Sequence, residues 1–152
     1  MIQSVQESPI ILTSNSAQLS LSNDDFRSRK ANCCGWLQHA EGSPLYKLLD
    51  GGLYEVSLNA NVSSATAGTV ALGLYEDGVL VQGTTVIAEV ATAGDFYNVS
   101  FDKLIKVCCN SNATLTIASV PSVLTGTTAP FTPTETEIPI IQNANFSIIK
   151  NS

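Results

Sequence analysis

The sequence has few charged residues. Asp, Glu, Lys and Arg make up only 13% of the 152 residues, against about a quarter in ordinary soluble domains. Acidic residues outnumber basic ones by 13 to 7, so the net charge is −6. Three basic residues gather at Arg27, Arg29 and Lys30, and so small a cluster releases few counterions from a nucleic acid. We therefore expect no nucleic-acid partner and interpret the cluster as a solvated strand edge.

The sequence also lacks a long hydrophobic run. The opening MIQSVQESPIILTSNSAQLSL has no basic region, and its longest apolar run is Ile10 to Leu12. We expect no secretory signal peptide and, since no stretch approaches eighteen apolar residues, no membrane span. Synthesis in the cytoplasm with release by cell lysis would suit such a chain.

The chemistry of an active site is sparse. His39 is the single histidine, and no GxSxG motif supplies a nucleophile to pair with it. The sequence predicts a protein that is not an enzyme, with no catalytic residues, no cofactor and no metal.

Apolar residues, by contrast, are abundant. They form 44% of a chain of 16.0 kDa, which suits a single core. The scaling of accessible surface area with mass gives a folded monomer roughly 7,400 Å² of surface, which is about 370 Å² for each charged side chain. A surface with so few charged side chains predicts that part of it is buried against identical copies.

Period-two alternation dominates the middle of the chain. In Leu53–Val62 the apolar residues alternate with Glu55, Ser57, Asn59 and Asn61, as in a half-buried strand. Thr69–Val81 breaks at Asp77-Gly78, which favours a type I′ hairpin. Further strands are expected at Thr84–Val90, Phe96–Phe101, Leu104–Cys109 and Ala113–Val120, with weaker ones at Pro9–Leu12, Ala17–Leu21, Asp25–Lys30, Trp36–Gln38 and Leu45–Leu48. No window predicts a helix, so we expect an all-β antiparallel jelly-roll sandwich of about 8 to 10 strands.

The ends of the chain differ from this middle. Residues 1–22 are interpreted as a first strand and a tether, and 23–152 as the jelly-roll domain. Pro121–Glu137 is rich in Thr and Pro and shows no period, so we expect a long loop that reaches outward or to a neighbour. Ile138–Lys150 resumes strand character and is expected to lie beside the first strand.

The four cysteines form two vicinal pairs, Cys33-Cys34 and Cys108-Cys109. Neighbouring strand residues point to opposite faces, so a vicinal pair suits a zinc tetrahedron poorly. Reduced thiols with one member of each pair in the core are favoured, and a disulfide between the pairs and a metal site stay open.

Aromatic side chains are candidates for ligand contact. Trp36, Tyr46 and Tyr75 could stack against the face of a sugar ring, although aromatic residues on strands more often pack in the core.

Two segments resemble known families. GLYEVSL at Gly52–Leu58 and VALGLYEDG at Val70–Gly78 resemble strands of the complement-type and tumour-necrosis-factor-like jelly rolls. The wider run from Leu53 to Ile117 looks like small proteins encoded among virion genes of tailed bacteriophages and prophages. The resemblance implies a tight homotrimer that serves as a fibre head, decoration or receptor-binding tip. Some related domains bind calcium at the trimer apex, but no carboxylate cluster here matches such a site.

The function expected from these features is structural. The chain would be a non-enzymatic phage virion protein, such as a capsid decoration, head fibre or tail component, which forms a homotrimer and contacts other virion proteins at the particle surface. The alternative is an adhesin-like tip that binds a host-surface glycan or receptor. A hydrolase of surface polymers is a third possibility, and it would need two carboxylates in a cleft.

Overall fold

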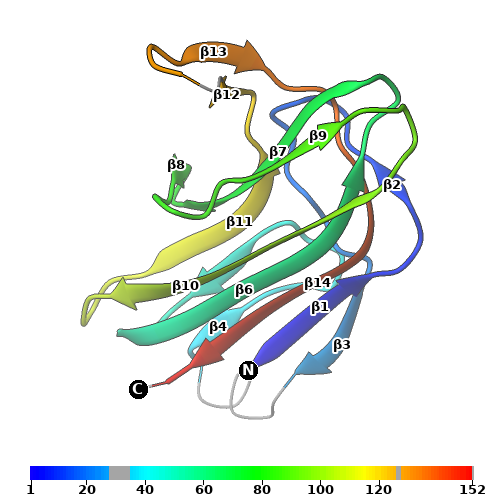
Figure 1. The fold of residues 1–152 in the computed structure, drawn as a ribbon. Coiled ribbons are helices and arrows are strands. Elements are labelled where there is room, and N and C mark those ends of the chain that lie inside the picture. The colour runs from blue at the N-terminus through cyan, green and yellow to red at the C-terminus, as the bar shows by residue number, and fades with distance from the viewer. Residues whose placement is uncertain (28–34, 126–127, 152) are drawn as a thin grey trace.

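The computed structural model describes residues 1–27, 35–125 and 128–151. Every regular element among them is a β-strand, and all pairings are antiparallel (Figure 1). Sheet A contains β1 (Ile2–Gln6), β2 (Ile10–Ile11), β3 (Asn23–Arg27), β6 (Gly52–Ser63), β10 (Tyr97–Val107) and β14 (Ile140–Lys150). Sheet B contains β4 (Leu37–Gln38), β5 (Tyr46–Leu48), β7 (Gly68–Glu76), β8 (Val79–Leu80), β9 (Val86–Val90) and β11 (Ala113–Ser119). The antiparallel jelly-roll sandwich expected from the sequence is confirmed.

Sheet order brings distant segments together. Sheet A runs β10-β6-β14-β1-β3 with β2 beside the start of β14, and sheet B runs β4-β5-β11-β7-β8 with β9 on β7. The last long strand lies between β6 and the first strand, with Ile2 opposite Ile148. The expectation that the carboxyl-terminal strand pairs beside the first strand is therefore confirmed.

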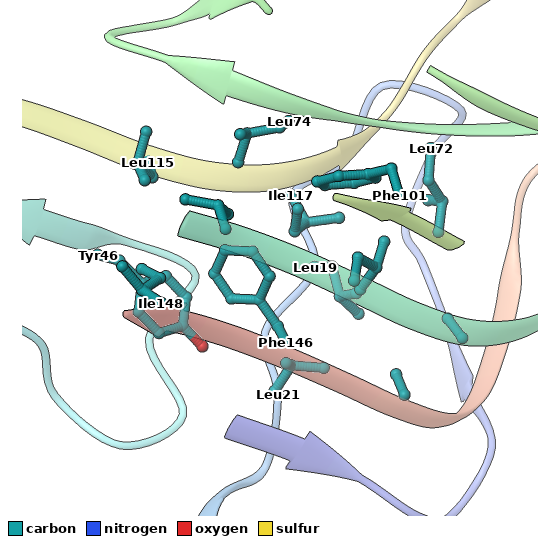
Figure 2. Packing of buried hydrophobic residues seen from close by; sticks show 14 of the residues in the cluster. Leu19, Leu21, Tyr46, Leu72, Leu74, Phe101, Leu115, Ile117, Phe146 and Ile148 are labelled. Carbon is teal, nitrogen blue, oxygen red and sulfur yellow. The ribbon is translucent and has the colours of Figure 1, made fainter. Parts of the chain in front are cut away.

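The core lies between the two sheets. The predicted alternation of β6 is confirmed, because Tyr54, Val56 and the next three alternate residues are buried. Figure 2 shows Phe146 and Ile148 of β14 facing Leu115 and Ile117 of β11 across this layer. The apolar stripes of the two sheets thus supply one continuous core, and burial of this surface drives the packing of the layers.

Two local predictions met different outcomes. The turn at Asp77-Gly78 is confirmed, since both residues have positive φ (50° and 83°) and β8 folds back on β7. The strands expected at Phe96–Phe101 and Leu104–Cys109 form one strand, β10, because its pairing with β6 continues through Asp102 and Lys103. Polar and charged residues at these two positions are tolerated since the strand lies at the edge of the sheet.

The amino-terminal segment is part of the sandwich. Ile2 and Ser4 of β1 are buried, and Leu12, Leu19 and Leu21 belong to the core. This segment supplies an interior strand of sheet A and core side chains, so residues 1–22 belong to the same sandwich as residues 23–152. Their assignment as the first strand agrees with the structure, and a role as a tether to a particle stays a prediction.

The segment Pro121–Glu137 is not the loop expected from its composition. It contains a hairpin of β12 (Ser122–Thr125) and β13 (Thr132–Glu135), which lies outside the two sheets (Figure 1). The backbone N–H of Thr136 donates to the carbonyl of Pro121 at 3.0 Å and closes the base of the hairpin. The four residue pairs satisfy its backbone without a period-two apolar pattern, which explains why the sequence pattern misses it.

Candidate functional site

The aromatic residues singled out in the sequence lie in different places. Trp36 is 5% exposed beside Tyr54, with ring centroids 5.6 Å apart. Tyr46 is 2% exposed and packs edge-on against Phe146 at 4.9 Å. These two residues are therefore core side chains and offer no platform to a ligand. Tyr75 is half-buried on β7 and lines a groove on the outward face of sheet B.

The described cysteine pair is on the surface. Cys108 and Cys109 are exposed free thiols just after β10, so the prediction that one of them packs in the core is wrong. They lie in a turn in which the N–H of Ser111 donates to the carbonyl of Cys108 at 3.1 Å. A Cβ at Gly51 would lie 2.8 Å from the Cα of Cys109, so only glycine allows this close approach. Cys33 and Cys34 fall outside the described residues, as do Arg29 and Lys30 of the basic cluster.

His39 is held in a buried cluster that links the edges of the two sheets. Its Nδ1 lies 2.8 Å from the carbonyl oxygen of Leu45, and its Nε2 lies 3.3 Å from Oδ1 of Asp24 on β3. The Ser4 hydroxyl donates to the same Asp24 oxygen at 2.6 Å. The carboxylate therefore lies between the hydroxyl and the imidazole, whereas a nucleophile relay needs the imidazole between them. The arrangement suits a structural link between β3 and the chain after β4.

The described part of the chain contains neither a group of metal-ligating side chains nor a helix that could span a membrane. Within residues 1–27, 35–125 and 128–151, no three His, Cys, Asp or Glu side chains are grouped so that they could hold a metal ion. The same residues contain no helix with the length and hydropathy to cross a membrane.

The outward surface of sheet A carries an extensive array of uncharged polar side chains. This polar face consists of Gln3 of β1, Ser57, Asn59 and Asn61 of β6, Asn98, Ser100 and Asp102 of β10, and Asn145 and Ser147 of β14. The strand register places them in rows across the sheet, and one row runs from Asp102 through Ser57 and Ser147 to Gln3. Asp102 is the single charged member of the nine.

The polar face is ordered by its own hydrogen bonds. The hydroxyls of Ser57 and Ser147 are 2.6 Å apart. The side-chain amide of Asn98 donates to the side-chain oxygens Oδ1 of both Asn59 and Asn61 at 3.0 Å. A hollow of about 300 Å³ lies among these side chains. Alternation in β6 indicated its polar side in advance, but the rows needed the register of β10, β14 and β1.

Exposed apolar side chains occur on two neighbouring edge strands of the sandwich. Strands β9 and β10, each an edge strand of its sheet, lie next to one another. Ile87 of β9, Phe96 before β10 and Leu104 of β10 are between 36% and 56% exposed. We call these three residues the apolar edge. A polar sheet face and an apolar edge are two distinct surfaces of one protomer.

Comparisons with known proteins identify the fold of this chain. No family model matches the chain, and no curated protein matches it. Among solved structures, the globular domain of the zebrafish complement 1qA protein superposes with a TM-score of 0.58 at 10% identity, covering 99% of this chain and 96% of that chain. Murine APRIL at pH 8.5 superposes with a TM-score of 0.51 at 11% identity, covering 95% of this chain and 94% of that one. The fold is a complement-type jelly roll. At such identities the likeness concerns the fold alone.

Proposed function

We propose that this chain is a non-enzymatic structural module that assembles as a homotrimer through the polar face of sheet A and the apolar edge. The carrying observation is that the polar face, which spans four strands, holds one charged residue among nine side chains, and that exposed Leu104 lies on the same side of β10 two residues beyond Asp102. The complement-type fold supports it, because the family resemblance of the sequence implies homotrimers.

The chemistry of the two surfaces is suited to association. Burying an uncharged amide or hydroxyl that keeps a hydrogen-bond partner costs far less than burying a charge. The surface area of 7,796 Å² leaves about 390 Å² for each of the 20 charged side chains, so charge is sparse over the whole molecule. Contact between a face of one protomer and an edge of the next is heterologous, and such contacts generate a closed ring when the rotation between protomers closes, as in a trimer.

The finer proposal places the module in a phage particle, as a capsid decoration, head fibre or tail component. Its support is the resemblance of the run from Leu53 to Ile117 to virion-gene products. Immunogold labelling of purified particles of the encoding phage tests it. Labelled particles would support the virion role, and particles free of both label and the chain's peptides would overturn it.

Assembly is tested by light scattering coupled to size-exclusion chromatography. A trimer of the 16.0 kDa chain has a mass of about 48 kDa. The substitution Asn59→Asp keeps the oxygen that accepts from Asn98 but adds a charge in each protomer of the proposed interface. We expect it to dissociate the trimer, because like charges would be buried without partners.

The matched control is Asn112→Asp, the same chemical change at an exposed turn position away from the polar face. It should leave the trimer intact. A wild-type mass near 16.0 kDa at micromolar concentration would overturn the proposal. A trimer unaffected by Asn59→Asp would remove the polar face from the interface.

A further inference from the structure

A second polar surface lies on the opposite side of the sandwich. A groove of about 250 Å³ runs along the outward face of sheet B. The residues that line it are uncharged, and they include Gln18, Tyr75, Thr116 and Ser119. All of them belong to one protomer, so the groove does not depend on the proposed trimer.

The strand register directs these side chains to the same side. Tyr75 lies directly opposite Thr116 in the pairing of β7 with β11. Gln18 forms a bridge with Ala118, two residues further along β11. Because side chains alternate across a strand, Tyr75, Thr116 and Gln18 point outward while Leu74, Ile117 and Leu19 enter the core. The groove therefore combines one aromatic ring with an amide and hydroxyls from three separate segments.

The outward polar groups of Thr116 and Gln18 keep hydrogen-bonding capacity toward the groove. The Thr116 side chain is 6% exposed, and its hydroxyl donates to the carbonyl of Ile117 at 3.4 Å. Ser119 lies opposite Leu72, so its side chain points to the inner face of sheet B rather than into the groove, and its hydroxyl donates to the carbonyl of Ala71 at 3.3 Å. A hydroxyl that donates one hydrogen bond still has lone pairs that can accept another. The amide of Gln18 is exposed and can both donate and accept.

Because no charged residue lines the groove, it favours an uncharged ligand. An anionic or cationic ligand would lose hydration without meeting an opposite charge, whereas a ligand rich in hydroxyls would meet donors and acceptors. Burial raises the pKa of Tyr75, so its phenol stays uncharged at neutral pH. Gly78, which has no side chain, lies at the groove with no heavy atom within 4 Å of its Cβ position and leaves that end open. The volume is below the roughly 300 Å³ at which pockets for drug-sized ligands begin.

We propose that this groove binds a neutral sugar unit, with the Tyr75 ring against one face of the sugar and Gln18 and Thr116 on its hydroxyls. An apolar C–H face stacks on an aromatic ring, and the hydroxyls at the rim of the sugar exchange donors and acceptors with the protein. The site differs from the one expected at Trp36 and Tyr46, which are both buried.

The test is a titration of the full chain followed by amide NMR. The probes are glucose, galactose, mannose and N-acetylglucosamine at tens of millimolar. At least one should give saturable shifts at Gln18, Tyr75, Gly78 and Thr116, while the amides of the polar face on sheet A stay unchanged. Absence of saturable shifts with all four sugars, or shifts confined to sheet A, would overturn the proposal.

Variants then assign the contacts. Gln18→Ala and Thr116→Val should each weaken binding about tenfold, the effect of one lost hydrogen bond. Gln82→Ala, at an exposed turn, is the matched control for Gln18→Ala and should bind as wild type. Tyr75→Phe should retain binding because the ring remains, and Tyr75→Ala should abolish it. Equal affinity of Gln18→Ala and Gln82→Ala would contradict the site.

Two further measurements test whether the ligand is uncharged and whether sugar binding is independent of trimer assembly. Glucuronate, the charged relative of glucose, should bind more weakly than glucose, and tighter binding would overturn the neutral class. Asn59→Asp should leave sugar affinity unchanged, since it changes sheet A alone. Thermal unfolding of each variant identifies any loss of binding caused by unfolding, because Tyr75 also packs against the apolar cluster of Ala71, Val120 and Val123.

Discussion

The outward surfaces of the two sheets are built in opposite ways. On sheet B, Ala71 and Val120 pack under Val123 of the β12 hairpin, with Tyr75 and Leu80 of the β7–β8 hairpin against them. On sheet A, the long strands β6, β10 and β14 present rows of Asn and Ser that no hairpin formed by the described residues covers. One surface is thus closed by apolar side chains from its own chain, and the other is left polar.

This difference shows where a partner is needed. When hairpins of the same chain cover the outward face of a sheet, its apolar side chains need no partner protein. A small polar groove can remain beside the hairpins. A surface of ordered amides and hydroxyls is stable in water and is also compatible with burial against a similar surface. The same sandwich can therefore reserve one side for its own assembly and keep the other for a ligand.

The largest effect is expected from a change on the inner side of sheet A. Phe146 is fully buried against Tyr46, whereas its neighbour Ser147 points outward. Phe146→Ala should lower the free energy of unfolding by about 3–5 kcal/mol because it leaves a cavity. Ser147→Ala should change it by less than about 1 kcal/mol, the usual size of one exchanged hydrogen bond.

Chemical denaturation of the two variants under conditions where the chain is monomeric makes this measurement. Similar losses in both would mean that the inner and outward sides of sheet A are not energetically distinct. The comparison of the two sheets would then have no basis.

The apolar edge should affect assembly with little effect on folding. Leu104 is 56% exposed at this edge, and Leu124 is 65% exposed on the β12 hairpin. We expect Leu104→Asp to raise the concentration at which the trimer dissociates by at least about tenfold, because it buries a charge in the proposed contact. Leu124→Asp is the matched control and should leave assembly unchanged. Sedimentation velocity over a dilution series makes the measurement, and equal effects of the two variants would move the contact to another surface.

A smaller loss is expected on the covered side of sheet B. A Cβ at Gly73 would lie 2.5 Å from Cδ1 of Leu80 and 3.1 Å from Cγ2 of Val120. Gly73→Ala should therefore destabilise the fold by about 1–3 kcal/mol, the usual range for overpacking. Ser100→Ala, at an exposed position of sheet A, is the control and should be nearly neutral in thermal unfolding. A neutral Gly73→Ala would indicate that the hairpins cover sheet B only loosely.

Much of the fold could be predicted from side-chain alternation. Strand β6 alternates clearly because one face is core and the other is not, and Asp77-Gly78 marks its hairpin by conformational preference. The hairpin in 121–137 and the unbroken β10 could not be predicted in this way. Their pairing satisfies backbone groups while the side chains follow no apolar period.

The candidate sites depended on register, which the sequence does not encode locally. Trp36 and Tyr46 carry no mark that separates a core aromatic from an exposed one, since short strands such as β4 and β5 show too little alternation. Tyr75 was a candidate from its residue type, but its neighbours Gln18 and Thr116 come from segments brought together only by pairing on β11. Local pattern thus identifies strands better than the surfaces that several strands build.

The smallest expected effect concerns the proton balance at the end of β7. Burial, and then the charge of Asp77, raise the pKa of the Glu76 carboxyl above its ordinary value. Between that ordinary value and the raised one, the folded state binds more protons than the unfolded state, so stability falls as pH rises through this window. Glu76→Gln should remove this slope and raise the unfolding temperature at pH 7. The gain should stay below about 0.5 kcal/mol because the side chain is largely solvated. Calorimetry from pH 3 to 7 should show that the gain in stability of Glu76→Gln vanishes at the acidic end.

A gain in stability that is equal at all pH values would assign the effect of Glu76→Gln to packing around β7 and β8. The hairpins that cover sheet B would then also pack against Glu76.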